Sequence, residues 1–176
     1  MAGLDVPFTA ITIDADESYP EDLKGGDIPA FISRAKAQAY ARELKEDQLL
    51  ITADTIVWLD GKMLGKPHDE AEAKTMLRAL SGKTHQVFTG VTFAEKLPTF
   101  DFRLSTIVDC TDVTFAELTD EEIDYYVNKY RPMDKAGAYG VQEWIGYVAC
   151  TGMNGSYFNV MGFPVHKVYE KLKNYI

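Results

Sequence analysis

The sequence predicts an α/β fold in which helices lie on the faces of a mixed sheet. Segments with apolar residues three or four positions apart alternate with apolar runs rich in β-branched residues, as helices and strands do. Several strand-like runs are joined by short connections, which indicates antiparallel pairs within the sheet. At 176 residues with 46% hydrophobic residues, the chain suits one substantial domain or two small lobes.

The first third of the chain predicts a strand, an acidic loop and a helix. The strand covers Val6–Ile13 and the loop Asp14–Pro20. Asp27 is expected to cap a helix that runs to about Leu44, because Pro29 then falls in the first turn. The spacing of apolar residues predicts an inward stripe made of Ile28, Phe31, Ile32, Ala35 and Ala39.

A hairpin follows this helix. The apolar run Leu49–Trp58 leads to a turn at Asp60–Gly61, and the chain returns as Met63–Pro67. The two-residue turn sets the register of the hairpin, because it places Leu59 opposite Lys62.

The rest of the chain continues the alternation of helices and strands. One helix opens at Asp69 and Glu70 and closes at Ser81–Gly82, with Ala73, Met76, Leu77 and Leu80 on its inner face. A capping box of Thr119 and Glu122 opens another, which reaches Val127 or Tyr130. The remaining predicted elements are strands over Gln86–Phe93 and Phe102–Phe115 joined by Glu95–Thr99, a loop or short helix over Pro132–Gln142, a strand over Ile145–Ala149, a turn over Gly152–Ser156 and a helix over Pro164–Leu172.

The composition excludes several classes of partner. A net charge of −9 argues against binding to nucleic acid polymers or anionic membranes, which depends on basic surfaces. Cys110 and Cys150 form no CxxC pattern, so neither a zinc site nor a disulfide framework is predicted. Without a targeting segment or a long apolar span, we expect a reduced protein in the cytoplasm.

An acid within the hairpin is the most informative feature. Asp54 lies in an apolar run, where an ionised carboxylate is costly unless a partner stabilises it. It is either a metal ligand or base for water, or a salt-bridged carboxylate at a strand end. Counting back from the turn pairs Thr55 with Lys66, so Asp54 and Lys66 lie at the same end. They can share a face only if Gly65 or Pro67 breaks the ladder.

Other charged residues could complete a site. Glu17 lies in the acidic loop, and Lys36 lies at the edge of the inward stripe of the first helix. Acids with two lysines suit Mg²⁺-bound phosphate chemistry, although a lysine can also simply expose its head at the surface. Asp134 and Lys135 form a further pair before Gly137 and Gly140, which is either a ligand-binding loop or a turn with an exposed ion pair.

Common catalytic motifs are absent from the sequence. Gly65-Lys66 is followed by Pro67 and lacks the glycine of a P-loop, and no GxGxxG, HExxH or GxSxG occurs. His68, His85 and His166 have no nucleophile motif nearby, so we interpret them as surface or packing residues.

Several motifs together nevertheless resemble the Maf family of nucleoside triphosphate pyrophosphatases. The resemblance covers nearly the whole chain, because the motifs occur in order. They are Thr52–Thr55, Asp60-Gly61, Leu64–Pro67, Leu80–Gly82, Pro132–Gln142 and Met161–Pro164.

The resemblance implies a single Maf/inosine-triphosphatase-like domain over residues 1–176. Such a domain has a mixed sheet with helices on its faces and a cleft between two lobes. The resemblance also implies metal-dependent hydrolysis, with Mg²⁺ or Mn²⁺, of a nucleoside triphosphate to the monophosphate and pyrophosphate. The Ala-Asp-Thr motif and the Ala-Gly-Ala-Tyr-Gly-Val-Gln run resemble the branch that acts on dTTP and UTP. Whether the protein assembles into a homodimer stays open.

The family also implies roles for individual residues. Asp54 corresponds to the water-activating base, and Glu17 helps it to hold the metal. Lys36 and Lys66 neutralise phosphate oxygens. Thr55 and Gln142 influence the choice of base, and Asp134 and Lys135 are further substrate-binding candidates.

One departure from the family is large. Members carry a strand and a Ser-x-Ser-Pro-Arg-Arg segment where this sequence has only Met1-Ala2. A start codon assigned too late, a shortened chain and a degenerate member are open explanations. We expect an exposed sheet edge, an unfilled groove and weak or absent activity for the 176-residue form. A catalytically impaired nucleotide-binding regulator of septum formation is the alternative function.

Overall fold

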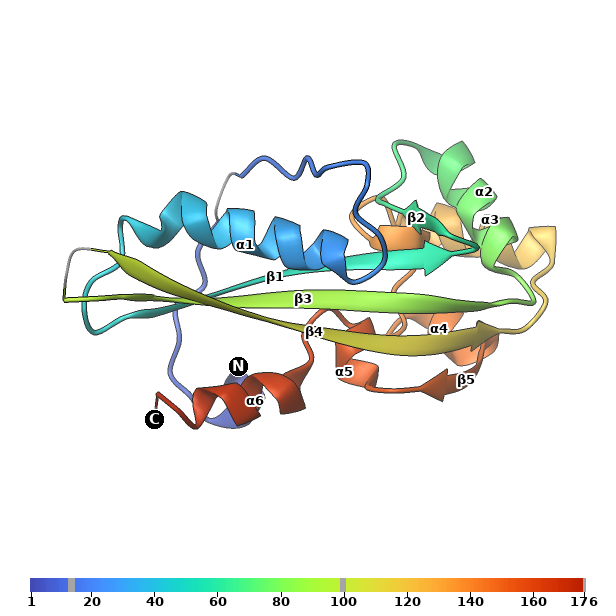
Figure 1. Cartoon of the computed structure of the whole chain (residues 1–176). Helices are drawn as coiled ribbons and strands as arrows, with labels where there is room; N and C mark the ends of the chain where they lie inside the picture. Colours follow the sequence, from blue (N-terminus) through green and yellow to red (C-terminus); the bar gives the residue numbers. More distant parts are fainter. Residues whose placement is uncertain (13–14, 99–100, 176) are drawn as a thin grey trace. The chain divides into compact units, whose positions relative to one another are not determined.

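The computed structural model describes residues 1–12, 15–98 and 101–175. The described strands form a five-stranded sheet in the order β2-β1-β3-β4-β5 (Figure 1). Helices alternate with these strands along the chain, so the predicted α/β fold is confirmed. The strands are β1 (Leu49–Leu59), β2 (Lys62–Leu64), β3 (Thr84–Lys96), β4 (Phe102–Phe115) and β5 (Cys150–Asn154).

The helices differ widely in length. None in the described part of the chain is both long and apolar enough to cross a membrane. They are η1 (Ala2–Leu4), α1 (Asp27–Ala41), α2 (Glu70–Leu80), α3 (Asp120–Tyr130), η2 (Ala136–Ala138), α4 (Trp144–Ala149), α5 (Tyr157–Val160) and α6 (Val165–Leu172).

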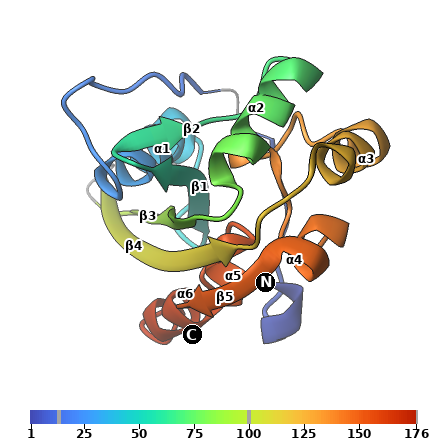
Figure 2. The same cartoon turned by 90° about the vertical axis from the view of Figure 1, so that its right-hand side faces the viewer.

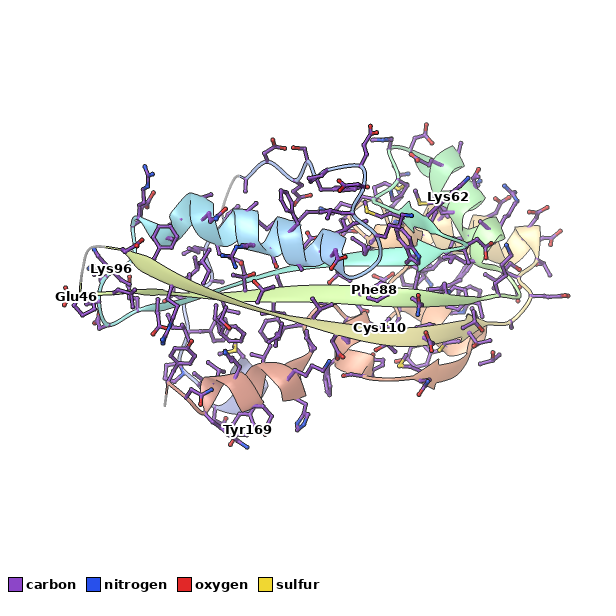
Figure 3. The ribbon with its side chains drawn as sticks, in the orientation of Figure 1. Glu46, Lys62, Phe88, Lys96, Cys110 and Tyr169 are labelled. Carbon is purple, nitrogen blue, oxygen red and sulfur yellow. The ribbon has the colours of Figure 1, made fainter. Side chains whose placement is uncertain are left out.

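The chain divides into two compact units. Phe88 on β3 and Cys110 on β4, labelled in Figure 3, lie in unit 2 at two of the points where the division falls. Within β1 the division falls between Asp54 and Thr55. Unit 1 comprises Met1–Asp54, Thr89–Asp109 and Gly162–Ile176, and unit 2 comprises Thr55–Phe88 and Cys110–Met161.

In unit 1, α1 and α6 lie on opposite faces of the sheet (Figures 1 and 2). The alternation of side chains along β3 explains both contacts. Val91 and Phe93 pack in one cluster with Val168 and Leu172 of α6. The intervening Thr92 bonds Ser33 of α1 with 3.0 Å between the hydroxyl oxygens, so the other face of the strand holds α1.

Close backbone contact fixes the start of α1. A Cβ on Gly90 of β3 would lie 2.4 Å from the Pro29 carbonyl oxygen and 2.5 Å from the Ala30 nitrogen. The Thr52 hydroxyl of β1 also donates to the Ser33 carbonyl oxygen at 2.7 Å. These contacts hold α1 against both strands, one turn before Lys36.

The core of unit 2 lies around α2 and α3, which Figure 2 shows beside each other, and α2 packs against both α3 and η2. Asp69 and Thr119 cap these helices, and Thr119 forms the predicted capping box with Glu122. The inner face of α2 is made of the four predicted residues, Ala73, Met76, Leu77 and Leu80. Leu59 pairs with Lys62 in the hairpin, so the predicted register is confirmed as well.

The predicted strand Val6–Ile13 is wrong over Val6–Thr12, which has no regular structure. A β-prone sequence becomes a strand only where a ladder partner and a buried face exist. Here Phe8 and Ile11 are 56% and 46% exposed, so no buried face forms. Ile13, Asp14 and Thr99, which belong to predicted segments, lie outside the described residues.

Two further predictions near the end of the chain are wrong. Ile145–Ala149 lies in helix α4, because Ile145 and Ala149 are buried four residues apart, which suits a helix face. Much of the turn predicted over Gly152–Ser156 belongs to β5, which pairs antiparallel with β4. These stretches contain too few apolar residues to distinguish helical spacing from strand spacing.

The predicted stripe and ends of α1 also need correction. Ile28 and Ile32 are buried, whereas Phe31 and Ala39 are exposed. Ser33 and Ala37 are also buried, and Ser33 hydrogen-bonds Thr92 of β3 and Thr52 of β1. The N-cap is Gly26, one residue before the predicted Asp27.

We predict that Gly90→Ala destabilises the protein by about 2–3 kcal/mol, because the added methyl group meets backbone that cannot move alone. Denaturant unfolding measures this change. Gly3→Ala is the matched control in unit 1, since nothing lies within 4 Å of the position of its Cβ. Equal stability of the two variants would contradict the close-contact interpretation.

Candidate functional site

In unit 1 two carboxylates converge on one ammonium group. Lys36 Nζ of α1 donates to Asp54 Oδ1 of β1 at 2.7 Å and lies 2.8 Å from Glu17 Oε1. The side chains of Lys36 and Asp54 are only 19% and 13% exposed, whereas Glu17 is 48% exposed. The structure therefore brings together three of the predicted site residues.

The charges of this cluster depend on one another. Burial lowers the pKa of Lys36, but its hydrogen bonds to Asp54 and Glu17, together with their negative charges, outweigh that effect and leave the pKa above its ordinary value. Lys36 is therefore stabilised in its charged form. The partner that Asp54 needs within its apolar strand comes from the first helix.

The donor set of the cluster suits a hard divalent cation. Glu17 and Asp54 offer carboxylate oxygens, and Mg²⁺ is commonly bound by one or two carboxylates together with substrate phosphates. No group of three or more histidine, cysteine, aspartate or glutamate side chains among the described residues could hold a metal. The two carboxylates fit a metal carried by the substrate better than a closed protein site.

A groove of about 1110 Å³ adjoins this cluster within unit 1. The irregular segment Val6–Thr12 and the first residues of β1, Leu49–Ala53, line it together with Lys36 and Glu17. In the part of the chain that the structure describes, β2 pairs with β1 only over Val57–Leu59, at the far end of the strand from Leu49–Ala53. An extended ligand in the groove would lie against the charged cluster.

In unit 2, the predicted break in the hairpin ladder occurs at Gly65. Strand β2 ends at Leu64, so Thr55 and Lys66 do not form the ladder pair that counting back suggested. Instead the Gly65 carbonyl oxygen accepts a hydrogen bond from Gly137 at 3.0 Å. This bond joins the exposed Lys66 loop to the segment that begins at Asp134.

Lys135 joins two acids of that segment. Its Nζ lies 2.9 Å from Asp134 Oδ1 and 3.2 Å from Glu143 Oε1. The bond from Lys135 lowers the pKa of Asp134, and the charge of Lys66 lowers it further. The predicted pair is therefore real, but it belongs to a larger network.

Two residues of this network could hardly be predicted from the sequence. Glu143 is the second acid on Lys135, and Tyr126 of α3 donates to Glu143 Oε2 while accepting from the Gly140 N–H at 3.0 Å. The helical spacing of Tyr126 predicts only a core residue. The only feature of the sequence that pointed to Glu143 was its position directly after the predicted Gln142.

Gln142 itself is exposed at the end of a buried stretch. Gly137–Val141 is buried, and the Glu143 N–H donates to the Gly140 carbonyl oxygen at 2.9 Å. Gln142 thus lies in a closed turn, with Thr55, Lys66, Asp134 and Lys135 in the same unit.

Comparison with known proteins shows the family of the chain. Residues 1–175 match the family described as Maf-like protein. The chain belongs to this family. Proteins named dTTP/UTP pyrophosphatase from Bacteroides thetaiotaomicron and Phocaeicola vulgatus are 56% and 53% identical to it, over 98% of the chain and 88% of their own length. One from Porphyromonas gingivalis is 49% identical over 99% of the chain and 87% of its own length.

In this family member, Tyr139 anchors the Asp134–Glu143 segment in the core of unit 2. Its hydroxyl lies 2.8 Å from Nε2 of His85, which is 1% exposed and packs edge-on against Phe115 and Tyr139. Nδ1 of His85 has no hydrogen-bond partner in the described structure. The prediction that His85 is a packing residue is confirmed, and His68 and His166 are exposed.

We predict that His85 makes stability depend on pH. Burial lowers its pKa from 6.5 to about 4, so below pH 6.5 the unfolded chain binds a proton that the folded chain does not. Stability is then complete above pH 6.5 and falls, by at most about 1.4 kcal/mol per pH unit, as the pH drops toward 4.

Denaturant unfolding between pH 4 and 7 measures this slope. His85→Phe should flatten it, although the variant also loses the bond to Tyr139. His166→Gln, at an exposed position, should leave the slope unchanged. A slope that survives in His85→Phe would show that other groups cause it.

Proposed function

We propose that this chain hydrolyses dTTP and UTP to the nucleoside monophosphate and pyrophosphate. The observation that carries the proposal is the name dTTP/UTP pyrophosphatase of relatives that are up to 56% identical over 98% of the chain. The charged cluster at Lys36 supports it, because phosphate chemistry needs a base and cations together.

In the proposed reaction Asp54 acts as the base. Its carboxylate accepts a proton from a water molecule as the water oxygen forms a bond to the α-phosphorus. The bond between that phosphorus and the oxygen bridging to the β-phosphate breaks, and pyrophosphate leaves with the electron pair. The hydrogen bond from Lys36 orients the Asp54 carboxylate for this transfer.

The lysines are proposed to counter the charge of the substrate. Lys36 keeps its proton because two acids raise its pKa, so it supplies a fixed positive charge in unit 1. Lys66 is exposed in its loop in unit 2, where a phosphate can reach it. A protein of net charge −9 needs such local cations to attract a triphosphate.

A divalent cation, Mg²⁺ or Mn²⁺, completes the proposal. Glu17 and Asp54 would hold it through their carboxylate oxygens. The bound metal would supply charge neutralisation at the phosphate oxygens.

The remaining predicted residues are proposed to recognise the nucleotide. Thr55 and Gln142 offer a hydroxyl and an amide for contacts with the base. Asp134 is 75% exposed, so it has more room for a substrate contact than Lys135, which is 22% exposed. We also propose that the protein works in the cytoplasm, where nucleoside triphosphates are made and used. Assembly of the protein into a homodimer stays a prediction.

Measurement of pyrophosphate released from dTTP in the presence of Mg²⁺ tests the function. We expect Asp54→Asn to lower the rate by about 100-fold or more, because the amide cannot take the proton. Asp109→Asn is a closely matched control. Asp109 is also on a strand of unit 1, is paired with a lysine at 2.7 Å and is 12% exposed, against 13% for Asp54.

Equal rates for Asp54→Asn and the unchanged protein would overturn the assignment of the base. Nucleotide binding by calorimetry without any pyrophosphate release would favour the binding-only alternative. Release from the Asp109→Asn variant at the rate of the unchanged protein is the result expected of the control.

A further inference from the structure

One hydroxyl group in unit 2 bonds to both ends of a turn. The turn runs from Gly140 to Glu143 and is closed by the Glu143 N–H on the Gly140 carbonyl oxygen at 2.9 Å. The Tyr126 hydroxyl accepts from the Gly140 N–H at 3.0 Å and donates to the Glu143 carboxylate. Tyr126 therefore bridges the first and last residues of the turn.

The surroundings of this hydroxyl make its bonds strong and directional. Tyr126 is completely buried and stacks on Tyr130 with 5.1 Å between the ring centroids. Burial raises the pKa of the Tyr126 hydroxyl, so it keeps the proton that it donates. Hydrogen bonds to a charged acceptor such as the Glu143 carboxylate are stronger than neutral ones.

Lys135 holds the same carboxylate from its other oxygen at 3.2 Å. The fit is tight, since a Cβ on Gly140 would lie 3.0 Å from both Lys135 Cε and Glu143 Cδ. The turn is thus fixed by a hydroxyl, an ion pair and a glycine that leaves no spare room. The side chain that it exposes to solvent is Gln142.

We propose that Tyr126 is a positioning residue that fixes Gln142 for recognition of the base. This inference rests on the proposed function. Thymine and uracil present a ring N–H beside a carbonyl oxygen, which an amide can meet with its oxygen and its NH₂ group. Cytosine presents the reverse pattern.

A turn held at both ends fixes the backbone position from which the Gln142 amide reaches the base, whereas a mobile turn lets the amide move to meet either base edge. Loss of the Tyr126 hydroxyl should therefore weaken discrimination between dTTP and dCTP while leaving the chemical step intact. Tyr126 acts through the backbone of the turn and touches no substrate.

Steady-state hydrolysis of dTTP and dCTP by Tyr126→Phe tests this role. We expect the KM for dTTP to rise about two- to tenfold, the range for one lost hydrogen bond, with kcat nearly unchanged. The ratio of kcat/KM for dTTP to that for dCTP should fall. Glu143→Gln keeps an oxygen for Tyr126 but loses the ion pair with Lys135, so it should give a smaller shift.

Tyr125→Phe provides the matched control on the same helix. Its hydroxyl accepts from Lys129 at 2.7 Å, and its side chain is 44% exposed, so both kinetic constants should stay as in the unchanged protein. Thermal melting checks that all variants are folded. An unchanged KM and selectivity in Tyr126→Phe, or an equal shift in Tyr125→Phe, would overturn the proposal.

Calorimetric titration with a non-hydrolysable dTTP analogue separates this inference from the proposed function. If the unchanged protein binds the analogue but releases no pyrophosphate, hydrolysis fails, and a weaker Kd in Tyr126→Phe still supports the positioning role. If the Kd values of the two proteins are equal, only the positioning role fails. If the unchanged protein neither binds nor hydrolyses nucleotides, both proposals fail.

Discussion

The contact between Asp54 and Lys36 is the interaction on which the charged cluster of unit 1 depends. An ionised carboxylate in an apolar strand is unfavourable unless a counter-charge and hydrogen bonds accompany it. Lys36 supplies both at 2.7 Å, and Glu17 balances the lysine from its other side. Lys36 of α1 can reach Asp54 because Gly90, which has no side chain, allows the start of α1 to lie directly on β3.

In unit 2, the largely irregular segment Asp134–Glu143 is held in a fixed conformation by hydrogen bonds outside any strand ladder. Backbone groups that leave a ladder need other partners. The Gly137 N–H donates to the Gly65 carbonyl oxygen, and the Gly140 N–H donates to the Tyr126 hydroxyl. The segment between them is buried, so the polar side chains at its ends are presented from a rigid support.

Much of this arrangement could be predicted from the sequence. Local signals were sufficient for α2, α3 and the hairpin, because caps, a two-residue turn and regular apolar spacing all agree there. Glu17, Lys36 and Asp54 were all candidate site residues, because an acid in an apolar run requires a partner and the family resemblance implies roles for the three.

Other features depend on contacts that no local pattern encodes. Whether Val6–Thr12 becomes a strand depends on a ladder partner, and Ile145–Ala149 is too short to separate helical from strand spacing. Tyr126 resembles an ordinary core residue in the sequence. Its role arises only because α3 lies beside the turn that ends at Glu143.

Asp54 and Lys36 are proposed to serve chemistry rather than stability. The double variant Asp54→Asn with Lys36→Met removes both buried charges together, and its unfolding free energy and pyrophosphate release from dTTP are the measurements. We expect an unfolding free energy within about 1 kcal/mol of that of the unchanged protein, because removing both members of a buried ion pair is often nearly neutral, and we expect no detectable pyrophosphate release. A loss of about 3 kcal/mol or more with release retained would contradict it and make the pair structural.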